Sequence, residues 1–184
     1  MRILGVDPGL TRCGLGVVES ASARRVTLVD VRVATSPATL DTPARLAQIS
    51  ATLEEVLDEH RPEAVAMERI FARSNVSTIM GTAQVSGVIM LAAERRGLPL
   101  ALYTPSEVKA AVTGDGRAGK EQVTFMVQRL LALAEAPRPA DAADALAIAI
   151  AHAWRGAAAP VGSGATTDAQ RRWAEAEKAA RRRG

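Results

Sequence analysis

The residues RILGVDPG at positions 2–9 decide the fold. Residues 2–7 form a short apolar run rich in β-forming side chains, and the Pro8-Gly9 pair ends it with a turn. This pattern predicts a strand with Asp7 at its end, which is where sites assemble in α/β sheets. An aspartate before Pro-Gly also caps turns, so Asp7 alone does not establish a site.

The elements that follow complete a mixed sheet. Strands are expected at 13–19 and 26–34, joined by a short turn that indicates an antiparallel meander with the first strand. Two more strands, at 64–69 and 99–104, alternate with helices expected at 43–60, 76–96, 105–112, 120–133 and 140–154. We therefore expect an α/β fold with a mixed five-stranded sheet, helices on both faces, and crossover strands parallel to the first.

Length and charge indicate one domain and a basic tail. The chain has 184 residues and a net charge of +3. Residues 157–184 contain six basic and three acidic residues, so residues 1–156 are formally neutral. We expect one domain over 1–156 and a flexible basic C-terminal tail over 157–184. The sequence has a single cysteine, no signal peptide pattern and no apolar run of about eighteen residues, which favours a cytoplasmic protein without membrane contact.

Structural roles do not fully explain three further acidic residues. Glu68 lies at the end of AVAMER, a strand expected to be buried, where an unpaired carboxylate is costly. The neighbouring Arg69 does not resolve this, because adjacent strand residues point to opposite faces. Asp141 and Asp144 lie three residues apart in an otherwise apolar helix, so they share one face near its start. Helix capping accounts for one of these two aspartates better than for both.

Convergence of the four carboxylates would require a cation. Oxygen-only donors favour a hard ion, and Mg²⁺ is the usual one. Two ions bridged by one carboxylate suit in-line attack of water on a phosphodiester. The arrangement therefore predicts metal-dependent phosphodiester hydrolysis, with Mn²⁺ as a possible substitute for Mg²⁺.

Taken together, the motifs resemble those of the RuvC family of bacterial Holliday-junction resolvases, which have a ribonuclease H-like fold. The matching stretches are GVDPG (5–9), MERIF (67–71), SEVKAAVTGDGRAGKEQV (106–123) and DAADALAIA (141–149). The resemblance covers about residues 1–155 and implies a ribonuclease H-like nuclease domain. It implies a Mg²⁺-dependent endodeoxyribonuclease that acts in DNA recombination and repair. Such an enzyme is a homodimer that nicks two opposing strands of a four-way DNA junction symmetrically, alongside the RuvA–RuvB branch-migration complex.

The resemblance also assigns roles to residues. It implies that Asp7, Glu68, Asp141 and Asp144 bind the metal and that Lys109 and Lys120 are catalytic lysines. Each lysine can hold a phosphate as a point charge, although lysines are also common on solvated surfaces. Arg117, in the glycine-rich loop at 113–119, suits contact with the DNA backbone.

One aromatic residue and two arginines follow Glu68. Phe71 lies just past the strand end, where it can stack on an unpaired junction base or instead cover the start of the next helix. Arg69 and Arg73 beside it are expected to contact phosphates.

The helix expected at 76–96 carries two apolar faces. One face comprises Val76, Ile79, Met80, Ala83, Gly87 and Met90, and the other comprises Val85, Val88, Ile89 and Ala92. A surface helix needs one apolar stripe, so a second stripe indicates a second partner. A twofold-symmetric dimer is the simplest such partner, and a neighbouring helix of the same chain is the alternative.

Two other functions remain open at this point. An RNA-processing nuclease of the same fold would use identical metal chemistry and differ only in substrate. Sugar kinases and actin-like ATPases also begin with a strand, an aspartate and a glycine turn, but they need a second domain for which 184 residues leave no room.

Overall fold

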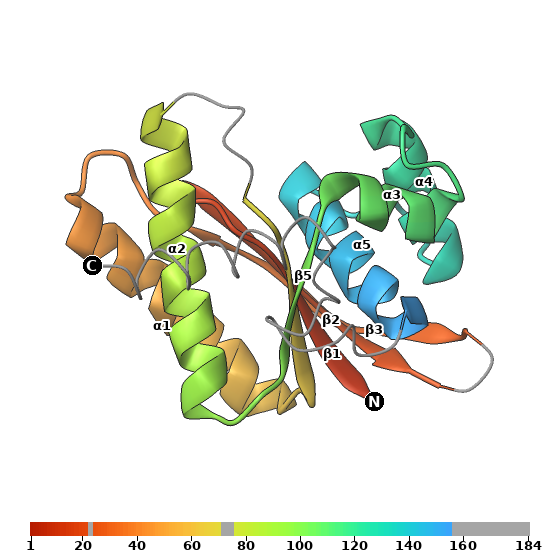
Figure 1. Ribbon diagram of the computed structural model, residues 1–184, viewed down its shortest axis with the longest axis horizontal. Helices are drawn as coiled ribbons and strands as arrows, with labels where there is room; N and C mark the ends of the chain where they lie inside the picture. The colour runs from red at the N-terminus through yellow and green to blue at the C-terminus, as the bar shows by residue number, and fades with distance from the viewer. Residues whose placement is uncertain (22–23, 71–75, 156–184) are drawn as a thin grey trace, which may run out of the picture.

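The computed structural model describes residues 1–21, 24–70 and 76–155. Its centre is a five-stranded sheet in the order β3-β2-β1-β4-β5 (Figure 1). The strands are β1 (Arg2–Asp7), β2 (Arg12–Ser20), β3 (Val26–Thr35), β4 (Ala64–Glu68) and β5 (Leu100–Tyr103). The first three pair antiparallel, whereas β4 is parallel to β1 and β5 is parallel to β4. The mixed sheet expected from the sequence is confirmed.

Helices cover both faces of this sheet (Figure 1). They are α1 (Thr42–His60), α2 (Val76–Arg95), α3 (Pro105–Thr113), α4 (Lys120–Leu130) and α5 (Ala140–Arg155). One core lies between the sheet and α1 and α2, and a second lies between the sheet and α3, α4 and α5. Within the described residues, no helix combines the length and apolarity needed to cross a bilayer.

The expected element boundaries hold to within one residue, with one exception. α4 ends at Leu130, three residues before the expected end at 133. Ala132 adopts a left-handed conformation with φ of 51°, which ends the helix. The side chain of Gln128 then donates to the carbonyls of Leu133 and Ala134, at 3.3 and 3.2 Å. No glycine or proline marks this end in the sequence, so the apolar pattern alone extended the helix too far.

Alternation along β1 decides which layer each side chain enters. Leu4 and Val6 enter the core beneath α1 and α2, whereas Ile3 enters the core beneath α5. Because successive side chains of a strand point to opposite faces, Gly5 and Asp7 lie on the same face as Ile3. Asp7 is therefore directed to the layer that contains α5.

Glycines in β1 and β2 let α5 approach the sheet closely. A Cβ at Gly5 would lie 2.2 Å from the carbonyl oxygen of Ala145, and one at Gly14 would lie 2.1 Å from that of Asp141. Neither position tolerates a side chain, because both neighbours are backbone atoms. The alanine-rich α5 completes the fit with its own small side chains, of which Ala145 and Ala149 are fully buried.

Candidate active site

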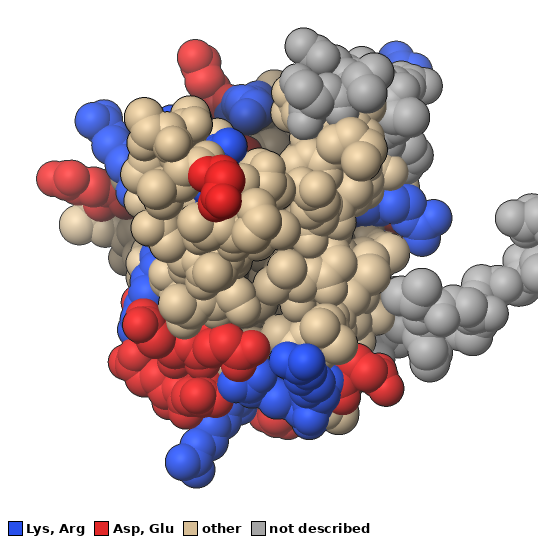
Figure 2. Space-filling view, turned by 90° about the vertical axis from the view of Figure 1, so that its left-hand side faces the viewer, with Lys and Arg blue, Asp and Glu red and all other residues tan. Residues whose placement is uncertain are grey.

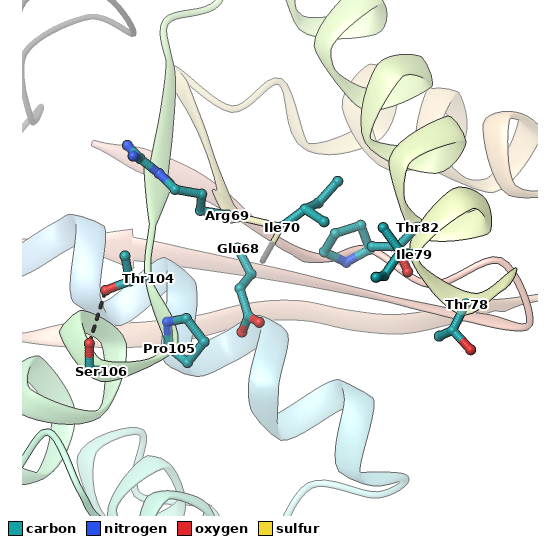
Figure 3. A pocket seen from close by; sticks show the side chains of 10 residues that line it. Glu68, Arg69, Ile70, Thr78, Ile79, Thr82, Thr104, Pro105 and Ser106 are labelled. Carbon is teal, nitrogen blue, oxygen red and sulfur yellow. Dashed lines mark hydrogen bonds between the residues drawn. The ribbon is translucent and has the colours of Figure 1, made fainter. Parts of the chain in front are cut away.

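Two carboxylates lie side by side at one edge of the sheet. Val6 of β1 pairs with Met67 of β4, and the next residues of the two strands are Asp7 and Glu68. Met67 enters the core beneath α1 and α2, so Glu68 lies on the opposite face, which Asp7 shares. Figure 3 shows the Glu68 side chain pointing towards α5 and that of Arg69 pointing away. The two carboxylates predicted at strand ends are thus neighbours.

α5 brings the third carboxylate into the same pocket. A pocket of about 270 Å³ is lined by Asp7, Glu68 and Asp144 together with Lys109 and Lys120. Three negative and two positive side chains therefore share one small volume. This is the charge pattern expected of a site for a phosphodiester and cations.

Asp141, one turn earlier on α5, faces a different neighbour. Its Oδ2 accepts a hydrogen bond of 2.8 Å from Nε of Arg12, at the start of β2. It lines an adjacent pocket, whereas Asp144 lies 3.4 Å from Nζ of Lys120. Each aspartate of α5 is therefore paired with a basic side chain. Asp141 still contributes to the electrostatic potential at Asp7.

Burial and neighbouring negative charge raise the pKa of two carboxyl groups. Burial, the largest cause, and the charges of Asp144, Glu68 and Asp141 together raise the pKa of Asp7 from 3.8 to about 7, while Lys120 opposes the rise. Burial and the charge of Asp144 also raise the pKa of Glu68, against the opposing effect of Lys120 and Lys109. The ionised cluster is therefore unfavourable without added positive charge.

The donor set fits a hard divalent cation. The pocket offers carboxylate oxygens and no thiolate or imidazole, which is the chemistry that Mg²⁺ and Mn²⁺ prefer. Among residues 1–21, 24–70 and 76–155, no three acidic, histidine or cysteine side chains already stand as a ready-made ligand cluster. The two aspartates of α5 are instead paired with Arg12 and Lys120.

Lys109 is positioned by a capped helix. The sequence TPSE at 104–107 forms a capping box at the start of α3, in which the Thr104 hydroxyl accepts from the Glu107 amide and the Glu107 carboxylate accepts from the Thr104 amide. The backbone hydrogen bond from Thr104 holds the pKa of Glu107 below its usual value. This fixed helix start presents Lys109 to the carboxylate pocket.

The residues expected to bind DNA do not all lie at the carboxylate pocket. Arg69 lines a pocket of about 590 Å³, to which Glu68 and the start of α2 also contribute (Figure 3). Arg117 is exposed in the loop before α4 and does not line the carboxylate pocket. Phe71 and Arg73 lie outside the described residues, so their expected roles remain predictions.

Two site residues escaped the sequence reasoning. No local pattern marks Arg12, because 129 positions separate it from its partner Asp141. Gly14 lies within a predicted strand, which by itself does not indicate a contact with α5. A signal for Gly14 exists: in CGLGV, Gly14 and Gly16 recur with the period of one strand face, opposite an alanine-rich helix.

Comparison with known proteins identifies the family. Residues 3–152 match the family model described as RuvC, crossover junction endodeoxyribonuclease. Curated proteins of that name include one from Saccharopolyspora erythraea, 63% identical over 84% of this chain and 78% of the relative. Another, from Paenarthrobacter aurescens, is 55% identical over 100% of this chain and 98% of the relative.

Solved structures agree with this assignment. The structure of Thermus thermophilus RuvC in complex with a Holliday junction substrate is 41% identical, with a TM-score of 0.79 over 84% of this chain and 94% of that one. The yeast mitochondrial Holliday junction resolvase shares the fold at 17% identity, with a TM-score of 0.60 over 82% of this chain and 77% of that one. The fold is thus ribonuclease H-like, as expected. The chain belongs to the RuvC family of crossover junction endodeoxyribonucleases.

Proposed function

We propose that this chain resolves four-way DNA junctions in recombination and repair by metal-dependent hydrolysis, with paired symmetric nicks in opposing strands. The observation that carries the proposal is the shared pocket of Asp7, Glu68 and Asp144 with Lys109 and Lys120, in a chain of this family. Family membership favours this reading over an RNA-processing nuclease or an actin-like or sugar-kinase-like ATPase. A chromosomal DNA substrate is consistent with the cytoplasmic location expected above.

Asp7, Glu68 and Asp144 would hold two Mg²⁺ ions, with Asp141 joining them once it leaves Arg12. Mn²⁺ is expected to substitute, because it accepts the same oxygen donors. When bound, such ions activate water and neutralise charge that develops on the phosphodiester. Their positive charge would also oppose the effects of burial and neighbouring negative charge that together raise the pKa of Asp7 to about 7, and so would favour its ionised form.

Lys109 and Lys120 supply positive charge from the protein itself. Both line the carboxylate pocket, from the helices α3 and α4. They can bind the non-bridging oxygens of the scissile phosphate and stabilise the negative charge that increases there in the transition state. Lys120 must leave Asp144 to do so, which the high exposure of its side chain, 77%, permits.

Symmetric nicking requires two copies of the chain, and α2 offers the surface for their contact. Met80 and Leu91 are 55% and 51% exposed on this helix. Ala83, Gly87 and Met90 are exposed too, so most of the first apolar face expected from the sequence is open, while Val85 and Ile89 are buried. Figure 2 shows a broad uncharged area on the side of the molecule that carries α1 and α2. A twofold dimer through α2 would cover it.

The remaining DNA contacts rest on the family resemblance. Arg69, Arg73 and Arg117 would bind backbone phosphates, and Phe71 would stack on a base at the junction centre. The basic tail at 157–184 would add non-specific attraction to DNA. Cooperation with RuvA–RuvB is proposed on the same basis.

Cleavage of matched substrates tests the proposal. A mobile four-way junction, a linear duplex of the same sequence and an RNA–DNA hybrid are incubated with the protein and Mg²⁺. Paired symmetric nicks with ligatable ends, in the junction alone, are expected. Preferential cutting of the hybrid would instead assign the same site to RNA processing.

Amide variants test the site. Asp7→Asn and Glu68→Gln should abolish cleavage and retain junction binding, because each removes a ligand charge with little change of shape. Glu55→Gln, at an exposed carboxylate of α1, is the matched control and should cut normally. Undiminished cutting by both amide variants would remove these carboxylates from the mechanism.

A further inference from the structure

A second pocket is lined in part by Asp141, one turn before Asp144 on α5. Its volume is about 400 Å³. Three threonine hydroxyls and two arginines contribute to its lining, which includes Thr11, Arg12, Arg45, Thr78, Thr82 and Asp141. Thr78 and Thr82 also line the large pocket beside Glu68 (Figure 3), so the three pockets form a continuous series of hollows around the site.

Arg45 is held in this pocket without an acidic partner among the described residues. Its Nε donates to Oγ of Ser36 at 3.0 Å, and its Nη2 donates to Oγ1 of Thr11 at 2.9 Å. Ser36, which is 2% exposed, in turn donates to the carbonyl oxygen of Leu10. The guanidinium is thus fixed to the turn that follows Asp7 by neutral oxygens. Two of its five N–H groups are used, and the others remain for a ligand.

Other half-buried arginines in the described part of the chain are neutralised. Arg32 pairs with Asp30 and Glu59, and Arg96 pairs with Glu54 and Asp58. No ion pair involves Arg45 within the described part of the chain. A partly buried guanidinium that is oriented by hydroxyls and uncompensated by a carboxylate attracts an anion, and its planar fork suits phosphate.

Among the described residues that line this pocket, Asp141 is the one acidic group, and Arg12 already compensates it. A cation bound to the carboxylates would release Arg12, whose side chain is 58% exposed and free to turn. Arg12 would then join Arg45 on the same anion. Binding of a cation to the carboxylates would thus leave the positive charge of Arg12 uncompensated in this pocket.

We propose that this pocket binds a backbone phosphate of the DNA strand being cut, adjacent to the scissile phosphate, through Arg45 with Arg12 as a second donor. This inference rests on the proposed function, because it takes junction DNA as the ligand. It assigns Arg45 the role of a positioning residue, which fixes the strand across the carboxylate pocket.

Salt-dependent binding tests the proposal. Junction affinity of the full chain is measured over a range of salt concentrations in EDTA, where no metal-dependent cleavage occurs, and again with Ca²⁺. Arg45→Gln should weaken binding about tenfold at low salt and reduce the slope of log K against log salt by about 1. Arg95→Gln, an exposed arginine at the far end of α2, should change neither value. An unchanged slope for Arg45→Gln, or an equal change for Arg95→Gln, would overturn the proposal.

A footprint on the unaltered protein guards against misfolding of the variant. Arginines are modified by a dicarbonyl reagent with and without junction DNA, and the modified positions are read by mass spectrometry. DNA should protect Arg45 and leave Arg95 reactive, whereas equal modification of Arg45 in both samples would refute the site. Neither readout depends on cleavage, so a wild-type protein that bound junctions without cutting them would overturn the proposed function and leave this test intact.

Discussion

Gly14 and Asp141 meet backbone to backbone: a Cβ at Gly14 would lie 2.1 Å from the carbonyl oxygen of Asp141. The first turn of α5, which carries the acidic residues, therefore rests directly on β2. This contact between main chains helps to set the position of Asp141 relative to Asp7.

Gly14→Ala should consequently impair both activity and stability. The added methyl group must push α5 away from β2, and overpacking of this kind costs about 1–3 kcal/mol. We expect the melting temperature to fall by several degrees and cleavage to fall at least a hundredfold. Gly87→Ala is the control for stability, which it should not lower, because a Cβ there meets nothing within 4 Å of the protomer. Normal cutting by Gly14→Ala would show that the carboxylates do not depend on this contact.

The stability of the metal-free protein should decrease as the pH rises from about 4 to about 7. Asp7 has its ordinary pKa of 3.8 when unfolded and a pKa of about 7 when folded. Between these values the folded chain keeps a proton that the unfolded chain releases, so the free energy of unfolding falls, by up to a few kcal/mol. The decrease should be complete above about pH 7.

Denaturant unfolding in EDTA across this pH range measures the effect. Asp7→Asn should flatten the decrease, because the amide does not titrate, and Glu55→Gln should leave it unchanged. The raised pKa of Glu68 acts in the same direction, so a residual slope in Asp7→Asn is expected. Identical pH profiles for wild type and Asp7→Asn would contradict the assignment.

Replacing Lys120 should separate binding from chemistry. Lys120→Gln removes a positive charge that lies 3.4 Å from Asp144 and opposes the raised pKa of Asp7. We expect kcat to fall roughly tenfold to a thousandfold, as for other donors that act on transition-state charge, with a much smaller change in junction affinity. Lys120→Arg, which keeps the charge, should retain more activity. A loss confined to affinity would make Lys120 a DNA contact without a role in the reaction.

The α2 surface should decide the oligomeric state. Gly87→Arg places a long charged side chain on an open part of this helix, where the folded protomer has room for it. The variant should sediment as a monomer and lose paired nicking, with its melting temperature at high dilution unchanged. Thr27→Arg, on the edge strand β3 at the other side of the sheet, should behave as wild type. A Gly87→Arg protein with the wild-type sedimentation coefficient would place the contact elsewhere.

Removal of the tail should affect binding more than cutting. A chain that ends at Gly156 loses six basic and three acidic residues. Its affinity for any DNA should fall at low salt, and the difference should disappear at high salt, because exposed charges are screened. Junction cleavage at saturating protein should persist. Loss of cleavage under saturation would instead assign the tail to the active enzyme.

The strand-end carboxylates were predictable because they depend on local rules. A strand stops at Pro8-Gly9, alternation assigns Asp7 to a face, and the parallel crossover brings Glu68 to the same edge. The two faces of α2 were likewise readable from periodicity, and burial of Val85 and Ile89 confirms one of them.

The rest of the site depends on contacts between distant segments. Arg12 meets Asp141 only because α5 packs across β2, and no pattern within either segment indicates the pair. The orientation of the Arg45 side chain depends similarly on its hydrogen bonds to Thr11, just before β2, and to Ser36, just after β3. Such pairings are set by the packing of the whole fold, which composition and periodicity do not encode.

The pairing of Val6 with Met67 also constrains how this enzyme can tolerate insertions and deletions. Loss of one residue within β4 would leave the strand apolar and able to pair, yet it would turn Glu68 into the layer beneath α1 and α2. Such a deletion should therefore reduce catalytic activity more than it disturbs folding. Insertions or deletions should therefore be tolerated in the loops, or within a strand when they comprise two residues. The number of residues in β1 before Asp7 and in β4 before Glu68 should otherwise stay constant.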